Sequence, residues 1–302
     1  MSRVTTPRAA SGGGPLAFVL VKAFGDLTVT AAVLRRLAPD ARQQCALLVS
    51  PHLLDLSRVL DPGCQVHCLP IGNGLPPLFD LKRHRPGVIV SSALTLRRTL
   101  ATAAPSTTLV FDRLSWRERF IVGRRCALPI GEDLAPNVYT AHEMFLQREG
   151  IGATLSPTPD VFALPVTSRR IGIFPFSRVA AKNVPFTLVE SIARQCRTHG
   201  FEPIVLLLEG EEFPSLPGVP VERLARRFDA LSQGISSVAA VVAADSLPAH
   251  LAEYNGRAAF VASPVENAHY LPPTTFAGHH WGLFTQPDEL GQRLARFLHS
   301  LS

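Results

Sequence analysis

Three groups of polar residues each follow a short apolar run of the chain. They are Lys22, Gly25 and Asp26; Ser177, Arg178 and Lys182; and Asp245, Ser246 and His250. The free N–H groups and positive dipole end of a helix N-terminus attract pyrophosphate, and a nearby lysine neutralises its charge. Lys182 and the chain after Asp245 therefore indicate a pyrophosphate-binding site.

The third group also has a purely structural interpretation. Asp245 or Ser246 ahead of Pro248 suits a helix N-cap, with proline in the first helical turn. His250 falls in the same turn, close enough to reach a ligand bound there. The residue types leave a capped helix and a ligand site as alternatives.

Apolar runs and amphipathic segments alternate along the chain, a pattern typical of parallel α/β sheets. In the first half we expect strands at residues 16–21, 45–50, 65–71, 87–92 and 107–111, with helices at 26–40 and 137–151. In the second half we expect strands at 170–176, 202–209, 239–244 and 257–263, with helices at 185–200, 228–238, 248–256 and 287–302.

These two arrays predict two Rossmann-like domains that face each other across a cleft. The predicted limits are a flexible leader at 1–14, a first domain at 15–155, a linker at 156–168 and a second domain at 169–302. Ligands of open parallel sheets bind at the carboxyl ends of the strands, so the cleft is the expected site.

Composition and motif content exclude several classes of protein. The 302 residues include no apolar segment long enough to span a bilayer. The sequence lacks G-x-G-x-x-G after its first strand, G-x-x-x-x-G-K-[ST] and G-x-S-x-G, which argues against a dehydrogenase, a P-loop kinase and an α/β-hydrolase. Five scattered cysteines favour a reducing cytoplasm, and no second ligand pair follows Cys64 and Cys68, so no metal site is expected.

The net charge of +6 is unevenly distributed. Residues 97–125 contain seven arginines against Asp112 and Glu118. Such a stretch attracts phosphates, nucleic acid or an anionic membrane face, although a solvated helix face explains it equally well. No nucleic-acid motif accompanies it, so no nucleic-acid partner is expected.

Three segments together resemble a known family. DSLPAHLA at residues 245–252 precedes the strand RAAFVAS, IGIFPFSRVAAKNVP contains Lys182, and LVKAFGDLTVTAAVLRRL contains Asp26. In this order and spacing they resemble the motifs of glycosyltransferase family 9, the heptosyltransferases of lipopolysaccharide assembly. The resemblance covers most of residues 16–264, and it departs at Leu247 and Phe176, where the family has glycine.

The resemblance implies a GT-B fold and an inverting, metal-independent glycosyltransferase with no cofactor. A heptose-like sugar would move from a nucleoside-diphosphate sugar to a lipopolysaccharide-type or other glycan acceptor. The first domain would bind the acceptor and the second the donor, and Asp26 would be the general base. The expected donor-binding residues are Lys182, Ser177, Asp245, Ser246, Leu247, His250 and, at the ribose, Glu212. The expected acceptor-binding residues are Lys22, Arg113 and Arg117.

Two alternatives remain beside this reading. One is a nucleotide-sugar epimerase of the same architecture, which needs no separate acceptor. The other is a degenerate, non-catalytic transferase-like binding subunit, because Leu247 and Phe176 replace glycines that let backbone approach phosphate. We expect a cytoplasmic protein whose acceptor is a glycan or lipid-linked, with peripheral contact to the inner face of the membrane.

Overall fold

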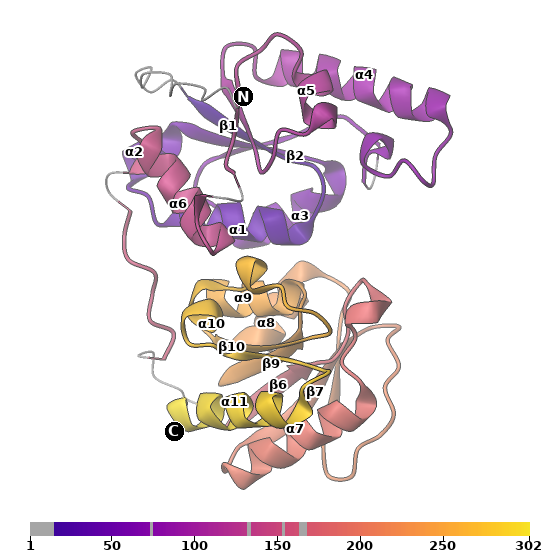
Figure 1. The fold of residues 1–302 in the computed structure, drawn as a ribbon, viewed down its shortest axis with the longest axis vertical. Coiled ribbons are helices and arrows are strands. Elements are labelled where there is room, and N and C mark those ends of the chain that lie inside the picture. Colours follow the sequence, from indigo (N-terminus) through magenta and orange to yellow (C-terminus); the bar gives the residue numbers. More distant parts are fainter. Residues whose placement is uncertain (1–14, 73–74, 132–133, 153–154, 163–167) are drawn as a thin grey trace, which may run out of the picture. The chain divides into compact units, whose positions relative to one another are not determined.

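The computed structural model describes residues 15–72, 75–131, 134–152, 155–162 and 168–302. The chain forms two compact units, each built around its own sheet (Figure 1). Among the described residues, the first unit comprises those in the ranges 15–57, 61–135 and 140–157, and the second comprises those in the ranges 58–60, 136–139 and 158–302. The long run of the second unit thus begins inside the linker predicted at 156–168, while the predicted leader lies outside the described residues.

The first sheet has five parallel strands in the order β3-β2-β1-β4-β5. Its strands are β1 (Leu16–Leu20), β2 (Cys45–Val49), β3 (Gln65–Cys68), β4 (Thr108–Phe111) and β5 (Ala127–Pro129). The helices that lie mainly in this unit are α1 (Phe24–Arg35), α2 (Pro39–Gln43), α3 (Pro51–Leu60), α4 (Pro86–Ala103), α5 (Trp116–Val122) and α6 (Val138–Arg148). Every residue of the central strand β1 is buried, as expected for a strand covered on both faces.

The second sheet has six parallel strands in the order β11-β10-β9-β6-β7-β8. Its strands are β6 (Arg170–Phe174), β7 (Glu202–Leu208), β8 (Val221–Leu224), β9 (Ala240–Ala244), β10 (Ala258–Ser263) and β11 (Trp281–Leu283). Its helices are α7 (Phe186–Thr198), α8 (Phe228–Ser236), α9 (Leu247–Tyr254), α10 (Pro273–Ala277) and α11 (Pro287–Ser300). In order of appearance along the chain this sheet reads 3-2-1-4-5-6, the Rossmann order.

Helices cover both faces of each sheet (Figure 1). In the first unit, Ala17 and Val19 of β1 face a core shared with Leu96 of α4. Phe18 points the other way, where its ring meets that of Phe145 in α6 edge-on, with centroids 6.3 Å apart. In the second unit α7 packs against α11, and α8 packs against α9. The predicted α/β class with parallel sheets is therefore confirmed.

One predicted strand is wrong. Residues 87–92 belong to α4, which begins at Pro86 and continues to Ala103. Its buried positions, Ala93, Leu96 and Leu100, recur at the helical period, whereas Val88 and Val90 are exposed. The β-branched residues suggested a strand, but the longer helical pattern and the proline at the first helical position determine the structure.

Strand order indicates where a ligand would be expected to bind in each unit. The order reverses between β1 and β4 in the first sheet and between β6 and β9 in the second. Open parallel sheets bind ligands outside the carboxyl ends of the strands at this switch point. Asp26 follows β1, Lys182 follows β6 and Asp245 follows β9, so all three residues follow strands that flank a switch point.

Candidate active site

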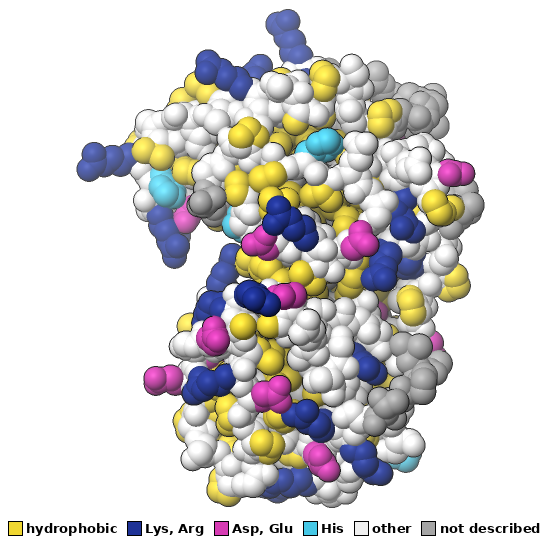
Figure 2. All heavy atoms as spheres, turned by 180° about the vertical axis from the view of Figure 1, so that it is seen from behind, with side chains coloured by type: hydrophobic (Ala, Val, Ile, Leu, Met, Phe, Trp, Pro, Cys, Tyr) yellow, Lys and Arg dark blue, Asp and Glu magenta, His cyan; other side chains and the backbone are white. Residues whose placement is uncertain are grey.

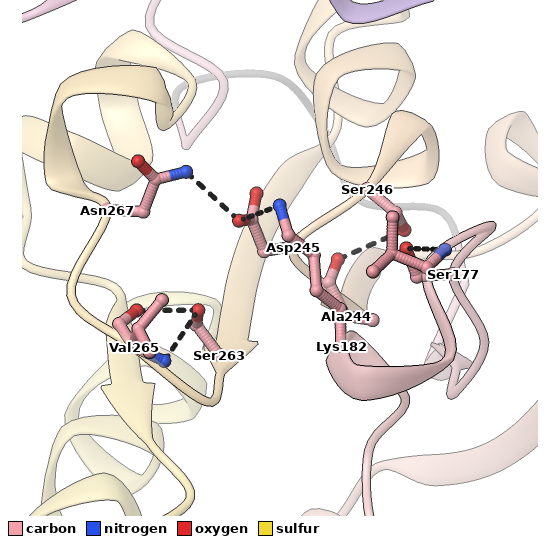
Figure 3. A network of polar contacts seen from close by, with 9 residues as sticks. Ser177, Lys182, Ala244, Asp245, Ser246, Ser263, Val265 and Asn267 are labelled. Carbon is pink, nitrogen blue, oxygen red and sulfur yellow. Dashed lines mark hydrogen bonds and ion pairs between the residues drawn. The ribbon is translucent and has the colours of Figure 1, made fainter. Parts of the chain in front are cut away.

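Lys182 and Asp245 form an ion pair in the second unit. Nζ of Lys182 lies 2.7 Å from Oδ2 of Asp245, and the Asn267 side-chain amide donates to the same oxygen at 3.1 Å (Figure 3). The Asp245 side chain is only 7% exposed, whereas that of Lys182 is 31% exposed. The lysine therefore presents a positive charge to solvent, held by a buried carboxylate from the neighbouring strand.

The two serines at these strand ends shape the backbone. The Ser177 side chain accepts a hydrogen bond from the backbone N–H of Val179, and the Ser177 N–H donates to the Asn183 side chain at 2.9 Å. Ser246 is the N-cap of α9, but its hydroxyl donates to the carbonyl of Ala244 at 3.2 Å and does not cap the helix (Figure 3). Ser246 thus occupies the N-cap position that the sequence predicts, with Pro248 in the first turn of α9, although its side chain makes no capping hydrogen bond.

His250 is buried in the first turns of α9. Burial lowers its pKa to about 4; among the nearby charges, Asp245 acts to raise this pKa and Lys182 to lower it. Within the same unit, the Tyr139 hydroxyl lies 2.9 Å from Nδ1 of His250. Burial raises the pKa of Tyr139 well above 10, so the pair consists of a phenol and a neutral imidazole over the physiological range.

The two other predicted donor residues, Leu247 and Glu212, and the neighbouring Phe176 differ in their surroundings. Leu247 is the first residue of α9 and is half-buried. Phe176 packs against the core of the second unit, with its ring edge-on to that of Phe213. Glu212 is exposed in the loop after β7, and its neighbour Glu211 instead closes that loop by accepting from the Leu208 N–H at 2.9 Å.

Asp26 lies in the first turn of α1, directly after β1. Its pKa is raised from 3.8 to about 6, chiefly by burial and then by the neighbouring carboxylate of Asp112, which follows β4. Lys22 and Arg113 partly offset these effects. A carboxylate with a pKa near neutrality accepts a proton and remains mostly ionised at pH 7.

Lys22 is engaged by a buried glutamate. Its Nζ lies 2.6 Å from Oε1 of Glu118 and 4.7 Å from the centre of the Phe79 ring. Ser115, the N-cap of α5, donates to the other oxygen of Glu118 and accepts from the backbone N–H of Arg117. Lys22 and Ser115 together lower the pKa of Glu118 against the opposing effect of burial.

The two predicted acceptor arginines are near the same strand ends. Arg113 follows Asp112 after β4, and its side chain is 60% exposed. The Arg117 guanidinium lies 5.5 Å from the centre of the Trp116 ring on α5. The first unit thus brings Lys22, Asp26 and Arg113 to one edge of its sheet, with Arg117 on the adjoining helix.

Sequence reasoning missed several residues of these sites. Asp112 directly follows an apolar run that was itself predicted as a strand, so the rule that selected Asp26 also selects it. Ser115 and Glu118 form an S-x-x-E capping box, another readable signal. Asn267 and Tyr139 lie far from their partners in sequence, and no motif indicates either residue.

The described residues contain neither a cluster of metal ligands nor a membrane-spanning helix. No three His, Cys, Asp or Glu side chains in the described part of the chain gather where they could hold a metal ion. Over the same residues, no helix is both long enough and apolar enough to cross a bilayer.

By sequence, neither a protein-family model nor a curated protein matches the chain. Solved structures do match. A glycosyltransferase family 9 protein from Veillonella parvula superimposes with a TM-score of 0.62 at 12% identity, covering 97% of this chain and 99% of that protein. The E. coli heptosyltransferase WaaC with ADP-2-deoxy-2-fluoro heptose has a TM-score of 0.59 at 10% identity, with coverages of 95% and 100%.

The chain has the fold of these glycosyltransferases. E. coli ADP-heptose LPS heptosyltransferase II superimposes equally well, with a TM-score of 0.59 at 14% identity over 95% of this chain and 98% of that one. The GT-B fold predicted from the family 9 resemblance is thereby confirmed. At such low identity the likeness shows the fold alone.

Proposed function

We propose that the chain is a family 9 glycosyltransferase that moves a sugar from a nucleoside-diphosphate sugar to an acceptor hydroxyl, with inversion and without a metal ion. The observation that carries this proposal is the partly buried carboxylate of Asp26, with a pKa of about 6, at the switch point of the first sheet. A heptose-like sugar and a glycan or lipid-linked acceptor are the proposed substrates.

The donor diphosphate binds at the switch point of the second sheet. Lys182 supplies the positive charge, and the N–H groups at the start of α9 supply hydrogen-bond donors aligned with the helix dipole. These groups stabilise the charge that develops on the leaving diphosphate, a task that a divalent cation performs in other transferases. Asp245 is too buried and too close to Lys182 to face the diphosphate, so its role is to hold the lysine.

His250 remains neutral at the pH of the reaction because its pKa is about 4. A neutral imidazole adds no charge to the site and offers one N–H. With Nδ1 facing the Tyr139 hydroxyl, the phenol donates to Nδ1 and the proton of the ring resides on Nε2. We assign His250 to orienting the donor through this N–H.

In the reaction, the Asp26 carboxylate removes the proton from the acceptor hydroxyl as its oxygen attacks the anomeric carbon. The bond between that carbon and the diphosphate oxygen breaks, and its electron pair leaves with the diphosphate. Attack opposite the leaving group inverts the anomeric centre. Asp26 ends protonated and returns its proton to solvent, which a pKa near 6 allows at neutral pH.

The solved relatives support the nature of the donor. The E. coli heptosyltransferase WaaC was solved both with ADP and with an ADP-heptose analogue. Another solved heptosyltransferase, TibC, which superimposes with a TM-score of 0.54 at 11% identity, was solved with ADP-D-β-D-heptose. The departures at Leu247 and Phe176 leave the Lys182–Asp245 pair intact, which favours a working donor site over a degenerate one.

Thermal unfolding with a panel of nucleoside diphosphates and their sugars tests the proposal. One nucleoside diphosphate is expected to raise the melting temperature by mass action, and its sugar conjugate to release that diphosphate when an acceptor is present. Binding without turnover on any acceptor would indicate a non-catalytic subunit. Conversion of the nucleotide sugar without an acceptor would indicate an epimerase.

A further inference from the structure

Two helices of the first unit expose apolar side chains in regular stripes. On α4 the stripe consists of Val90 and Leu94, 53% and 41% exposed, followed one turn later by Arg97. On α5 it consists of Trp116 and Phe120, 62% and 43% exposed. Spacings of four and seven residues place each stripe on one side of its helix.

The two stripes belong to one surface. The helices pack against each other, and the Arg97 guanidinium lies against Gly123 at the end of α5, 2.7 Å from where a β-carbon would stand. Gly123 is one turn beyond Phe120, just as Arg97 is one turn beyond Leu94. We call these exposed residues, Val90, Leu94, Arg97, Trp116 and Phe120, the α4/α5 face.

The surroundings of this face are strongly basic. Residues 81–125 contain ten Lys and Arg against two acidic residues, Asp112 and Glu118. Glu118 is buried against Lys22, so it offsets little of the surface charge. Lys and Arg side chains project among hydrophobic ones on this unit, at the top of Figure 2.

We propose that the α4/α5 face docks on the surface of an anionic lipid bilayer. Exposed aromatic and aliphatic side chains enter the headgroup region, and the surrounding arginines bind the lipid phosphates, as in interfacial helices. The Arg117 guanidinium beside the Trp116 ring brings a charge and an amphipathic ring to the same depth. Docking is a property of this surface and is independent of the sugar transfer proposed above.

Other occupants fit this face less well. A second copy of the chain would bring two strongly basic surfaces together, which like-charge repulsion opposes. Single-stranded nucleic acid suits the arginines and Trp116, but Val90 and Leu94 offer its bases no stacking platform. Apolar side chains among arginines match lipid acyl chains beneath anionic headgroups.

Sedimentation of the full chain with vesicles tests the proposal, using equimolar phosphatidylglycerol and phosphatidylcholine against phosphatidylcholine alone. We expect binding to the anionic vesicles only. The double variant Trp116→Ser and Phe120→Ser is expected to bind the anionic vesicles about tenfold more weakly. The double variant Arg98→Gln and Arg124→Gln is expected to lose about fivefold in vesicle affinity for each arginine removed. Val221→Ser and the pair Arg194→Gln and Arg296→Gln, which change exposed residues of the second unit, are the matched controls.

A fluorescence measurement shows which residue inserts. Trp281→Phe leaves Trp116 as the only tryptophan, and its emission is expected to shift to shorter wavelength with anionic vesicles. Retention of full binding in the Trp116 and Phe120 variant would overturn the proposal. So would binding of RNA but not of vesicles, or a dimer that this variant dissociates.

Discussion

Lys182 and Asp245, separated by 63 residues in the sequence, meet at 2.7 Å because β6 and β9 are neighbours at the centre of the second sheet. The carboxylate is buried and the ammonium group is half-exposed. This asymmetry assigns them different tasks: Asp245 fixes the position of the lysine, and Lys182 remains accessible to an anionic ligand.

Separate roles for this pair lead to a prediction. Lys182→Met is expected to weaken binding of the nucleoside diphosphate by about 10–100-fold, the worth of a charge-assisted hydrogen bond. It is also expected to lower the free energy of unfolding by about 3 kcal/mol, because it leaves Asp245 buried without its partner. The double variant Lys182→Met with Asp245→Asn should recover stability but not binding, as calorimetric titration and chemical denaturation can measure. Lys82→Met, which changes an exposed lysine, is the control. Recovery of diphosphate binding in the double variant would show that Lys182 is not part of the donor site.

Asp26→Asn is expected to lower the rate of sugar transfer by about 10²–10⁴-fold, the usual contribution of a general base. The affinity for the nucleoside diphosphate should be unchanged, since Asp26 is not part of the donor site. Asp40→Asn, at an exposed carboxylate in the same unit, serves as the control. Single-turnover rates and titration of the diphosphate separate the two effects, and an undiminished rate would exclude Asp26 as the base.

The pH dependence of transfer follows from the pKa of Asp26. Because the base acts when ionised, kcat/KM is expected to rise with pH and to level off above an apparent pKa of about 6. Asp112→Asn removes a nearby negative charge that raises this pKa, so the rise should move to lower pH. If Asp112→Asn does not shift the pH profile of kcat/KM, a group other than Asp26 determines that profile.

The ionised Asp26 side chain is also expected to lower the free energy of unfolding. Its folded-state pKa, about 6, lies above the value of 3.8 for an unperturbed aspartate, so the folded chain binds more protons between these values. The free energy of unfolding therefore falls as pH rises from about 4 to 6. At pH 7 Asp26→Asn should raise it by about 1–3 kcal/mol. A less stable Asp26→Asn chain in urea denaturation at pH 7 would contradict this.

The contribution of His250 to the pH dependence of stability has the opposite sign. Its folded-state pKa of about 4 lies below the unfolded value of 6.5, so its contribution to stability is present above pH 6.5 and is lost as pH falls to 4. Its NMR signals should show no titration between pH 8 and about pH 5. Tyr139→Phe is expected to cost about 1–3 kcal/mol, because it leaves a buried ring nitrogen unsatisfied. A midpoint for His250 near 6.5 would show that it is not buried as described.

Much of the fold is readable from the sequence because its central strands are continuous apolar runs. β1, β9 and β10 were predicted for this reason, and each is buried throughout. The short strands β5 and β11, three residues each, carry too little pattern to be recognised. Residues 87–92 resemble a strand because their β-branched side chains lie on an exposed helix face, and the helical period becomes visible only with the turns that follow.

The site was predictable where one rule applied, namely that polar residues at strand ends gather at the switch point. This rule found Asp26, Lys182 and Asp245, which all follow strands that flank a switch point. It could not show that Lys182 and Asp245 pair with each other, since pairing depends on side-chain direction. Nor could it find Asn267, whose contact with Asp245 depends on the path of the loop after β10.

A crystal structure with bound nucleoside diphosphate tests the central proposal most directly. The diphosphate oxygens are expected within hydrogen-bonding distance of Nζ of Lys182 and of the first backbone N–H groups of α9. A nucleotide bound away from the carboxyl ends of β6 and β9, with Lys182 still paired only to Asp245, would contradict sugar transfer at this site.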